Sequence, residues 1–93
     1  MKNSRIAALR SMLWQMEVEI GLEPLSQHQK DVYYAACLVA DEDEVVQSDE
    51  VRRHPMLGFM ARPTFYRALK DLVERGFLSA ASQRKDGKYK IQR

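Results

Sequence analysis

Residues 62–78 have the sequence RPTFYRALKDLVERGFL, which predicts an amphipathic helix that ends at a glycine. A proline such as Pro63 is tolerated in the first turn of a helix, and Gly76 follows the helix at the position where a positive φ is favoured. Apolar residues recur at helical spacing and predict its buried face, which consists of Phe65, Leu69, Leu72 and Val73. One side of this helix should therefore pack on a core while the other side faces solvent.

The residues after this helix predict a β-hairpin. Asp86-Gly87 is a strong signal for a two-residue type I′ turn. Such a turn pairs Arg84 with Tyr89, Ser82 with Ile91, and Ala80 with Arg93. Because side chains alternate along a strand, the hairpin has an apolar face and a basic face. We expect Leu78, Ala80, Tyr89 and Ile91 on the apolar face, and Lys85, Lys88 and Lys90 on the basic one.

The residues before position 62 predict two more helices and a short strand. Ser26 and Gln29 form a capping box, so a helix begins near Gln27 and runs to about Ala40, with Val32, Ala35, Ala36 and Val39 buried. Residues 41–44, DEDE, predict a solvated loop, with metal binding as the second interpretation. Residues 45–47, VVQ, predict a single edge strand. Ser48 is expected to be the N-cap of a short helix that Pro55 ends, and a turn containing Gly58 then follows.

Residues 4–21 predict a first helix with one narrow apolar stripe. Five apolar residues alternate at spacings of three and four, which fits the a and d positions of a coiled coil: Ile6, Leu9, Leu13, Met16 and Ile20. Trp14 lies beside Leu13 and widens the stripe. We expect this helix to form the interface of a homodimer, and the alternative is that the stripe packs on the core of its own domain.

The charges of the chain are strongly segregated. A length of 93 residues, with 45% hydrophobic and 30% charged residues, fits one soluble globular domain. Residues 17–50 contain ten acidic side chains and one base, a net charge of −9, whereas residues 62–93 contain nine bases and three acids, a net charge of +6. The C-terminal third is therefore expected to carry an anion-binding face. The alternative is an ordinary solvated surface of mixed charge.

The predicted order of elements is helix, helix, short strand, helix, turn, helix and hairpin. With its helix-turn-helix, the recognition-helix-like residues 62–78 and the wing-like residues 86–91, the chain resembles winged helix-turn-helix transcriptional regulators of the MarR and PadR kind. The resemblance covers roughly residues 26–93. The expected fold class is mainly α with a small β-hairpin wing. We expect residues 1–24 to form an N-terminal dimerisation helix and residues 25–93 to form a winged helix-turn-helix DNA-binding domain.

A helix of this kind fits the major groove of double-stranded DNA, where its N-terminal turns reach base edges. The positions expected to face the DNA are Arg62, Pro63, Thr64, Tyr66, Arg67 and Lys70. Arginine pairs with guanine, hydroxyls donate to phosphates, and proline offers apolar contact to a thymine methyl. Four wing bases would hold phosphates: Arg84, Lys85, Lys88 and Lys90. The alternative is that these bases only solubilise an exposed helix and hairpin.

Other classes of function have weak support. His28, His54 and Cys37 do not have the spacing of a zinc site, and no catalytic set, glycine-rich phosphate loop or cofactor motif can be assembled. We therefore expect no enzymatic activity, no metal and no cofactor. The absence of a long apolar run and of a signal peptide predicts a cytoplasmic protein that does not enter membranes. A protein-interaction module without DNA binding is the alternative function, and a ligand-sensing repressor is a third.

Overall fold

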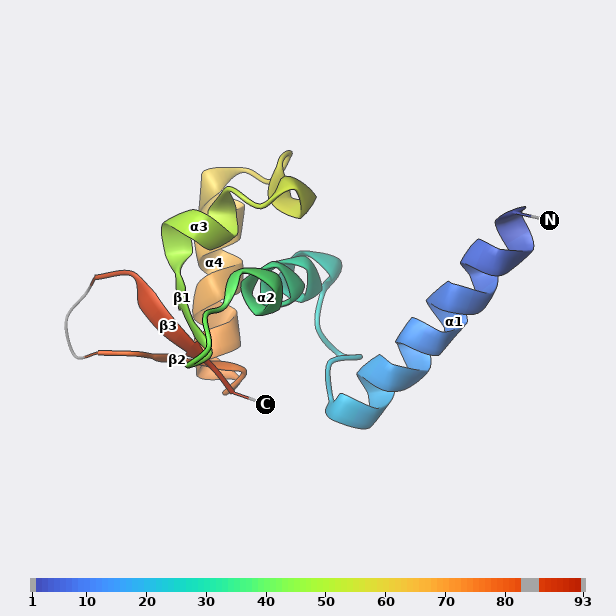
Figure 1. Ribbon diagram of the computed structural model, residues 1–93, viewed down its shortest axis with the longest axis horizontal. Helices are drawn as coiled ribbons and strands as arrows, with labels where there is room; N and C mark the ends of the chain where they lie inside the picture. The colour runs from blue at the N-terminus through green and yellow to red at the C-terminus, as the bar shows by residue number, and fades with distance from the viewer. Residues whose placement is uncertain (1, 83–85, 93) are drawn as a thin grey trace.

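The computed structural model describes residues 2–82 and 86–92 and consists mainly of helices with one small sheet (Figure 1). The helices are α1 (Lys2–Ile20), α2 (Gln27–Val39), α3 (Ser48–Arg52) and α4 (Arg62–Glu74), with a 3₁₀ turn η1 (Pro55–Leu57) between the last two. The strands are β1 (Val45–Gln47), β2 (Leu78–Ala80) and β3 (Lys88–Ile91). The predicted class, mainly α with a small β-hairpin wing after a helix-turn-helix and an N-terminal helix, is confirmed.

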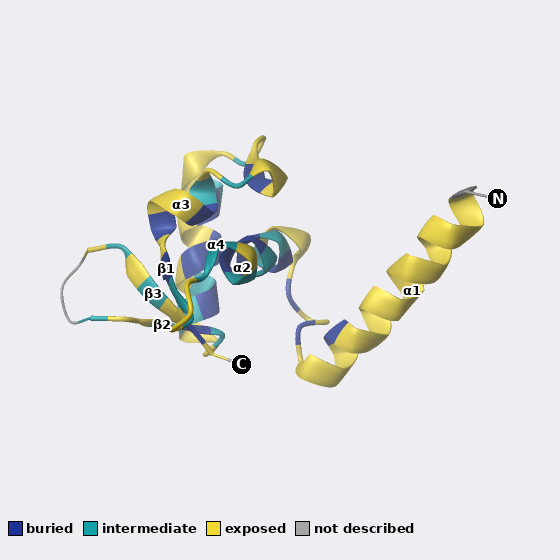
Figure 2. Ribbon diagram, in the orientation of Figure 1, coloured by how far each residue is buried: buried dark blue, intermediate teal, exposed yellow. Residues whose placement is uncertain are grey.

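The core lies where α2, α3, α4 and the sheet meet (Figure 2). Phe65 and Leu72 of α4, Val32 of α2, and Leu78 of β2 are all buried there. Two predicted core residues, Val39 and Val73, are only half-buried and pack against its edge. Ala68, which was not predicted to be buried, belongs to the core. It lies between Phe65 and Leu72 on the inward side of α4.

The three strands form an antiparallel sheet in the order β1-β3-β2, so the last strand lies in the middle. The predicted edge strand at residues 45–47 is confirmed. The predicted hairpin register is wrong: Leu78 pairs with Ile91 and Ala80 pairs with Tyr89. The register moves by an even number of residues, so the same residues stay on each face. Ala80 is nevertheless exposed, since it lies at the end of its strand.

Hydrogen bonds around Asp86 explain the longer loop of the hairpin. The Asp86 carboxylate accepts hydrogen bonds from the Lys88 amide, at 3.1 Å, and from the Ser82 hydroxyl, at 3.0 Å. Gly87 has a φ of +75°, and its carbonyl accepts a hydrogen bond of 2.8 Å from the Ser48 amide. Asp86-Gly87 therefore ends a longer loop instead of forming the turn by itself. Two predicted pairs, Arg84 with Tyr89 and Ala80 with Arg93, each include a residue outside the described ranges. The predicted wing bases Arg84 and Lys85 also lie outside them.

The capping predictions have two different outcomes. The capping box of α2 is confirmed: the Ser26 hydroxyl accepts from the Gln29 amide at 3.2 Å, and the Gln29 side chain accepts from the Ser26 amide at 2.9 Å. Ser48 is not an N-cap, because it is the first residue of α3 and follows Gln47, which caps nothing with its side chain. Its amide donates to the wing carbonyl of Gly87, and this bond holds Ser48 inside the first turn of the helix.

The acidic segment 41–44 has an internal hydrogen-bonded turn. The Asp41 carboxylate accepts hydrogen bonds from the amides of Asp43, at 2.9 Å, and Val45, at 3.0 Å. Glu44 has a φ of +64° and passes the chain into β1. Among the described residues, no group of three histidine, cysteine or acidic side chains is arranged to hold a metal ion. The exposure of Asp41, Glu42 and Asp43 agrees with the predicted solvated loop.

Candidate nucleic-acid interface and pairing helix

The solvent face of α4 carries the residues that were predicted to meet DNA. Because Phe65, Ala68, Leu69 and Leu72 point into the core, the helical period turns the other positions outward. Arg62, Pro63, Tyr66, Arg67 and Lys70 are exposed, and Thr64 is half-buried. The ring of Tyr66 packs edge-on against Phe65 at a centroid distance of 5.0 Å. This contact orients the Tyr66 ring beside the arginines of the same face.

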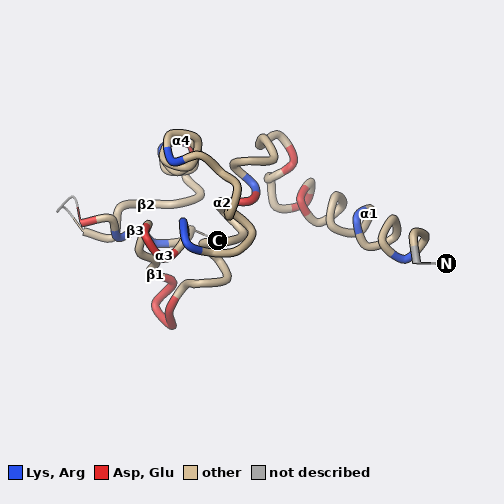
Figure 3. The backbone as a smooth tube through the Cα atoms, turned by 90° about the horizontal axis from the view of Figure 1, so that it is seen from above, with Lys and Arg blue, Asp and Glu red and all other residues tan. Residues whose placement is uncertain are grey.

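The two arginines on this face have no ion pair with the described carboxylates. Among the described residues, neither Arg62 nor Arg67 has a carboxylate within ion-pair distance. Lys70 approaches Glu74 at 4.0 Å, but both side chains are mostly exposed and such pairs contribute little. The acidic segment between α2 and β1 lies on the side of the domain away from α4 (Figure 3). The positive charge of α4 is therefore available to an anionic partner.

Contacts with α2 hold α4 in place. The Gln29 side-chain amide donates a hydrogen bond of 3.0 Å to the Asp71 carboxylate, which joins the first turn of α2 to the middle of α4. Thr64 and Arg67 border a shallow hollow of about 100 Å³ together with Ser26 and His28. The capping box of α2 thus lies beside the exposed face of α4.

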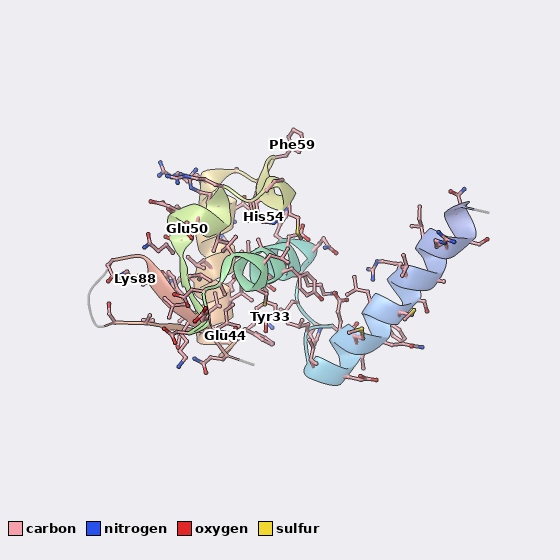
Figure 4. The ribbon with its side chains drawn as sticks, viewed as in Figure 1. Tyr33, Glu44, Glu50, His54, Phe59 and Lys88 are labelled. Atoms are coloured by element: carbon pink, nitrogen blue, oxygen red, sulfur yellow. The ribbon has the colours of Figure 1, made fainter. Side chains whose placement is uncertain are left out.

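The turn between α3 and α4 is built around a histidine cap. The Nδ1 atom of His54 accepts a hydrogen bond of 3.1 Å from the Met56 amide and starts η1. Leu57 is buried, whereas Phe59 lies at the tip of the turn and points into solvent (Figure 4). Ala61, immediately before α4, has no side chain that could cap the helix. Leu57 and the half-buried Met60 hold the turn against the domain.

Two arginines at the end of α3 were not among the predicted DNA contacts. Arg53 is exposed, and the Nε atom of the half-buried Arg52 has no hydrogen-bond partner among the described residues. These two arginines add positive charge just before the turn that leads into α4. The signal was present in the sequence as adjacent arginines just before the turn.

Two of the four predicted wing bases can be located. Lys88 and Lys90 are exposed on β3, and they alternate with the half-buried Tyr89 and the buried Ile91. Lys88 shares a hollow with Glu50 of α3, and both side chains are labelled in Figure 4. The hydrogen bond from Ser48 to Gly87 joins the wing to the start of α3. The wing and the helix-turn-helix are therefore mechanically connected.

The N-terminal helix α1 extends away from the domain (Figures 1 and 2). It contains eight of the twelve large hydrophobic side chains that are exposed among the described residues, including the whole predicted seam and Trp14. Exposure of the seam ranges from 38% at Leu13 to 64% at Ile6. The alternative prediction, in which this stripe packs on the core of its own domain, is not what the structure shows.

Among the described side chains of α1, only that of Glu17 is buried. Glu17 is 2% exposed, accepts a hydrogen bond of 3.1 Å from Lys30 and accepts another of 2.6 Å from the Tyr34 hydroxyl. Burial raises the pKa of Glu17, but the bonds from Tyr34 and Lys30 outweigh burial and hold the pKa below its ordinary value. Burial and the Glu17 carboxylate both raise the pKa of Tyr34. This cluster of Glu17, Lys30 and Tyr34, the anchor cluster, joins α1 to α2.

Comparison with known proteins adds no relative. No family model matches the chain, and no curated protein or solved structure matches it. No helix in the described part of the chain is long and apolar enough to cross a membrane. The assignment of function must therefore come from the site itself.

Proposed function

We propose that this protein is a cytoplasmic, sequence-specific DNA-binding transcriptional regulator that acts as a homodimer and has no catalytic role. The proposal rests mainly on one observation. The first turns of α4 expose Arg62, Tyr66 and Arg67 on a single face, and neither arginine is paired with a carboxylate of the described chain. An exposed helix start with unpaired arginines has the chemistry needed to read guanine edges in the major groove.

The wing and the end of α3 supply additional positive charge in this proposal. Lys88 and Lys90 on β3, and Arg53 after α3, are further exposed bases. In this proposal they contact phosphates, which adds affinity without reading sequence. The predicted wing bases Arg84 and Lys85 would add to the same contacts.

The dimer is proposed from α1. A helix with its apolar seam in water is stabilised when a partner covers that seam. A twofold dimer also presents two copies of α4 to half-sites that lie about 34–36 Å apart on DNA. A single copy of this domain has only one reading helix.

The test is a mobility-shift titration with random and selected duplexes at several salt concentrations. We expect binding, a selected sequence that binds more tightly than random duplex, and an affinity that falls steeply with salt because counterions are released from phosphates. If no duplex binds at low salt, the DNA proposal is wrong, and the alternative of a winged-helix module for acidic protein partners takes its place.

A further inference from the structure

The apolar seam of α1 is open along its whole length. Ile6, Leu13 and Ile20 occupy one heptad position, and Leu9 and Met16 occupy the other. All five side chains are exposed. The seam continues at its end into a cavity of about 440 Å³ that Ile20 lines together with Leu22, Tyr33 and Phe77. The surface that needs a partner therefore includes the helix and its junction with the domain.

The anchor cluster holds α1 from its flank and leaves the seam uncovered. Glu17 follows Met16 in the heptad, at the position beside the seam, and it is tied to Lys30 and Tyr34. Further support comes from the Leu22 amide, which donates a hydrogen bond of 2.8 Å to the Glu17 carbonyl. The domain thus fixes the C-terminal end of α1 while the rest of the helix remains available to another chain.

The charges of α1 are divided between its two halves. The N-terminal half carries Lys2, Arg5 and Arg10, and the C-terminal half carries Glu17 and Glu19. The first turn has no acidic residue and the last turn has no basic residue, so the charges oppose the dipole of the helix itself. A second copy that runs in the opposite direction places basic half against acidic half. This pattern therefore favours an antiparallel partner with the same sequence.

The heptad positions give the register of such a pair. In an antiparallel arrangement, Ile6 lies opposite the partner's Met16, and Leu9 lies opposite the partner's Leu13. The flanking Arg5 then approaches the partner's Glu19, and by symmetry this contact occurs twice. A parallel arrangement would instead place Arg5 beside the partner's Arg10, also twice. The antiparallel arrangement thus has two opposite-charge contacts against one like-charge contact, between the two copies of Arg10 at the twofold axis, whereas the charged contacts of the parallel arrangement are all between like charges.

We infer that two copies of this protein pair through α1 as an antiparallel, twofold-symmetric helix pair. The inference rests on the proposed dimer and specifies its interface and direction. A helix of this length measures about 28 Å, so antiparallel pairing places the two winged domains at opposite ends of a rod of that size. This length is comparable to the distance between half-sites on DNA, about 34–36 Å.

Charge reversal tests the direction of pairing. We expect Arg5→Glu and Glu19→Arg each to weaken self-association by roughly three- to tenfold in sedimentation experiments, and the double variant to restore most of it. Arg53→Glu is the matched control, since it makes the same charge change outside α1. In a parallel pair, Arg5→Glu would bring a glutamate beside the partner's Arg10 and strengthen association, which would overturn the inference.

Disulfide trapping provides a second, independent readout in a Cys37→Ala background. A mixture of Ile6→Cys and Met16→Cys chains should form mixed disulfide dimers under mild oxidation, while each variant alone should not. Efficient crosslinking of either variant with itself would indicate parallel pairing and overturn the inference. A wild-type chain that is folded by circular dichroism and monomeric at micromolar concentration would also overturn it. Duplex binding is measured separately, so the DNA proposal stands or fails without reference to these outcomes.

Discussion

The helices α1 and α4 both have apolar residues at helical spacing, but these residues have opposite surroundings. In α4 the apolar side chains Phe65, Leu69 and Leu72 are buried, and the bases between them face solvent. In α1 the apolar side chains face solvent, and the buried side chain is the carboxylate of Glu17. Helical spacing therefore shows that a helix has an apolar stripe, but it does not show which surface covers that stripe. In α4 the cover is the domain, and in α1 we propose that it is a second copy.

Large-to-small substitutions should show the largest difference between the two helices. Phe65→Ala removes a fully buried aromatic side chain and should lower the free energy of unfolding by about 3–5 kcal/mol. Leu9→Ala, at a position that is 59% exposed, should barely change the unfolding of dilute monomer and should weaken self-association. Urea denaturation at low and high protein concentration measures both effects. If Leu9→Ala destabilises the dilute monomer as strongly as Phe65→Ala, then α1 belongs to the core.

The anchor cluster should produce the next largest effect. Glu17→Ala leaves the Lys30 ammonium buried without its partner and should lower the free energy of unfolding by about 3 kcal/mol. Glu19→Ala, on the exposed side of the same helix, serves as the control and should change the unfolding of dilute monomer little. An equal effect of the two substitutions would show that the cluster does not hold α1 to the domain.

The same cluster predicts a dependence on pH. Because the pKa of Glu17 is lower in the folded chain than its ordinary value of 4.5, the stabilisation is complete above that value. It is lost as the pH falls through the folded-state pKa. Denaturation midpoints measured from pH 7 to pH 3 should therefore decline less steeply for Glu17→Ala than for the wild type. Parallel declines would contradict the assigned role of this carboxylate.

The smallest predicted effects concern the exposed side of α4 and the wing. Arg67→Ala should weaken binding to a selected duplex by about 1–3 kcal/mol and relax the preference at one base position. Lys88→Ala should weaken binding to all duplexes about equally and reduce the salt slope by about one. Competition titrations with single-base variants of the duplex distinguish the two. Identical, sequence-independent losses would make Arg67 another phosphate contact and leave the reading residue to be found elsewhere on α4.

Local sequence patterns predicted the structure correctly where that structure depends on neighbouring residues alone. The Ser26 capping box, the start of α4 at Arg62 and the positive φ of Gly76 were all predicted correctly. The errors arose where a distant segment intervenes. The wing carbonyl of Gly87 accepts from the Ser48 amide, which lies inside α3 and not at its cap, and Asp86 accepts hydrogen bonds within the longer hairpin loop.

The candidate site shows the same limit. Exposure of Arg62, Tyr66 and Arg67 follows from the helical period, so it could be predicted from the sequence. The burial of Glu17 could not be predicted, because it depends on Lys30 and Tyr34 of another helix. A glutamate beside an apolar stripe is expected to be solvated unless a buried partner is known.

The position of β3 in the middle of the sheet has a consequence for synthesis on the ribosome. The strands β1 and β2 each pair with β3 and not with each other, so neither ladder can form before residues 88–91 have been made. Helix α1, in contrast, emerges first and needs only local hydrogen bonds to form. Translation proceeds from the N-terminus at about 5–20 residues per second, so α1 seams on neighbouring nascent chains are exposed for seconds before either domain can close. Under the proposed pairing, two chains from one messenger RNA can therefore meet through α1 before their sheets are complete.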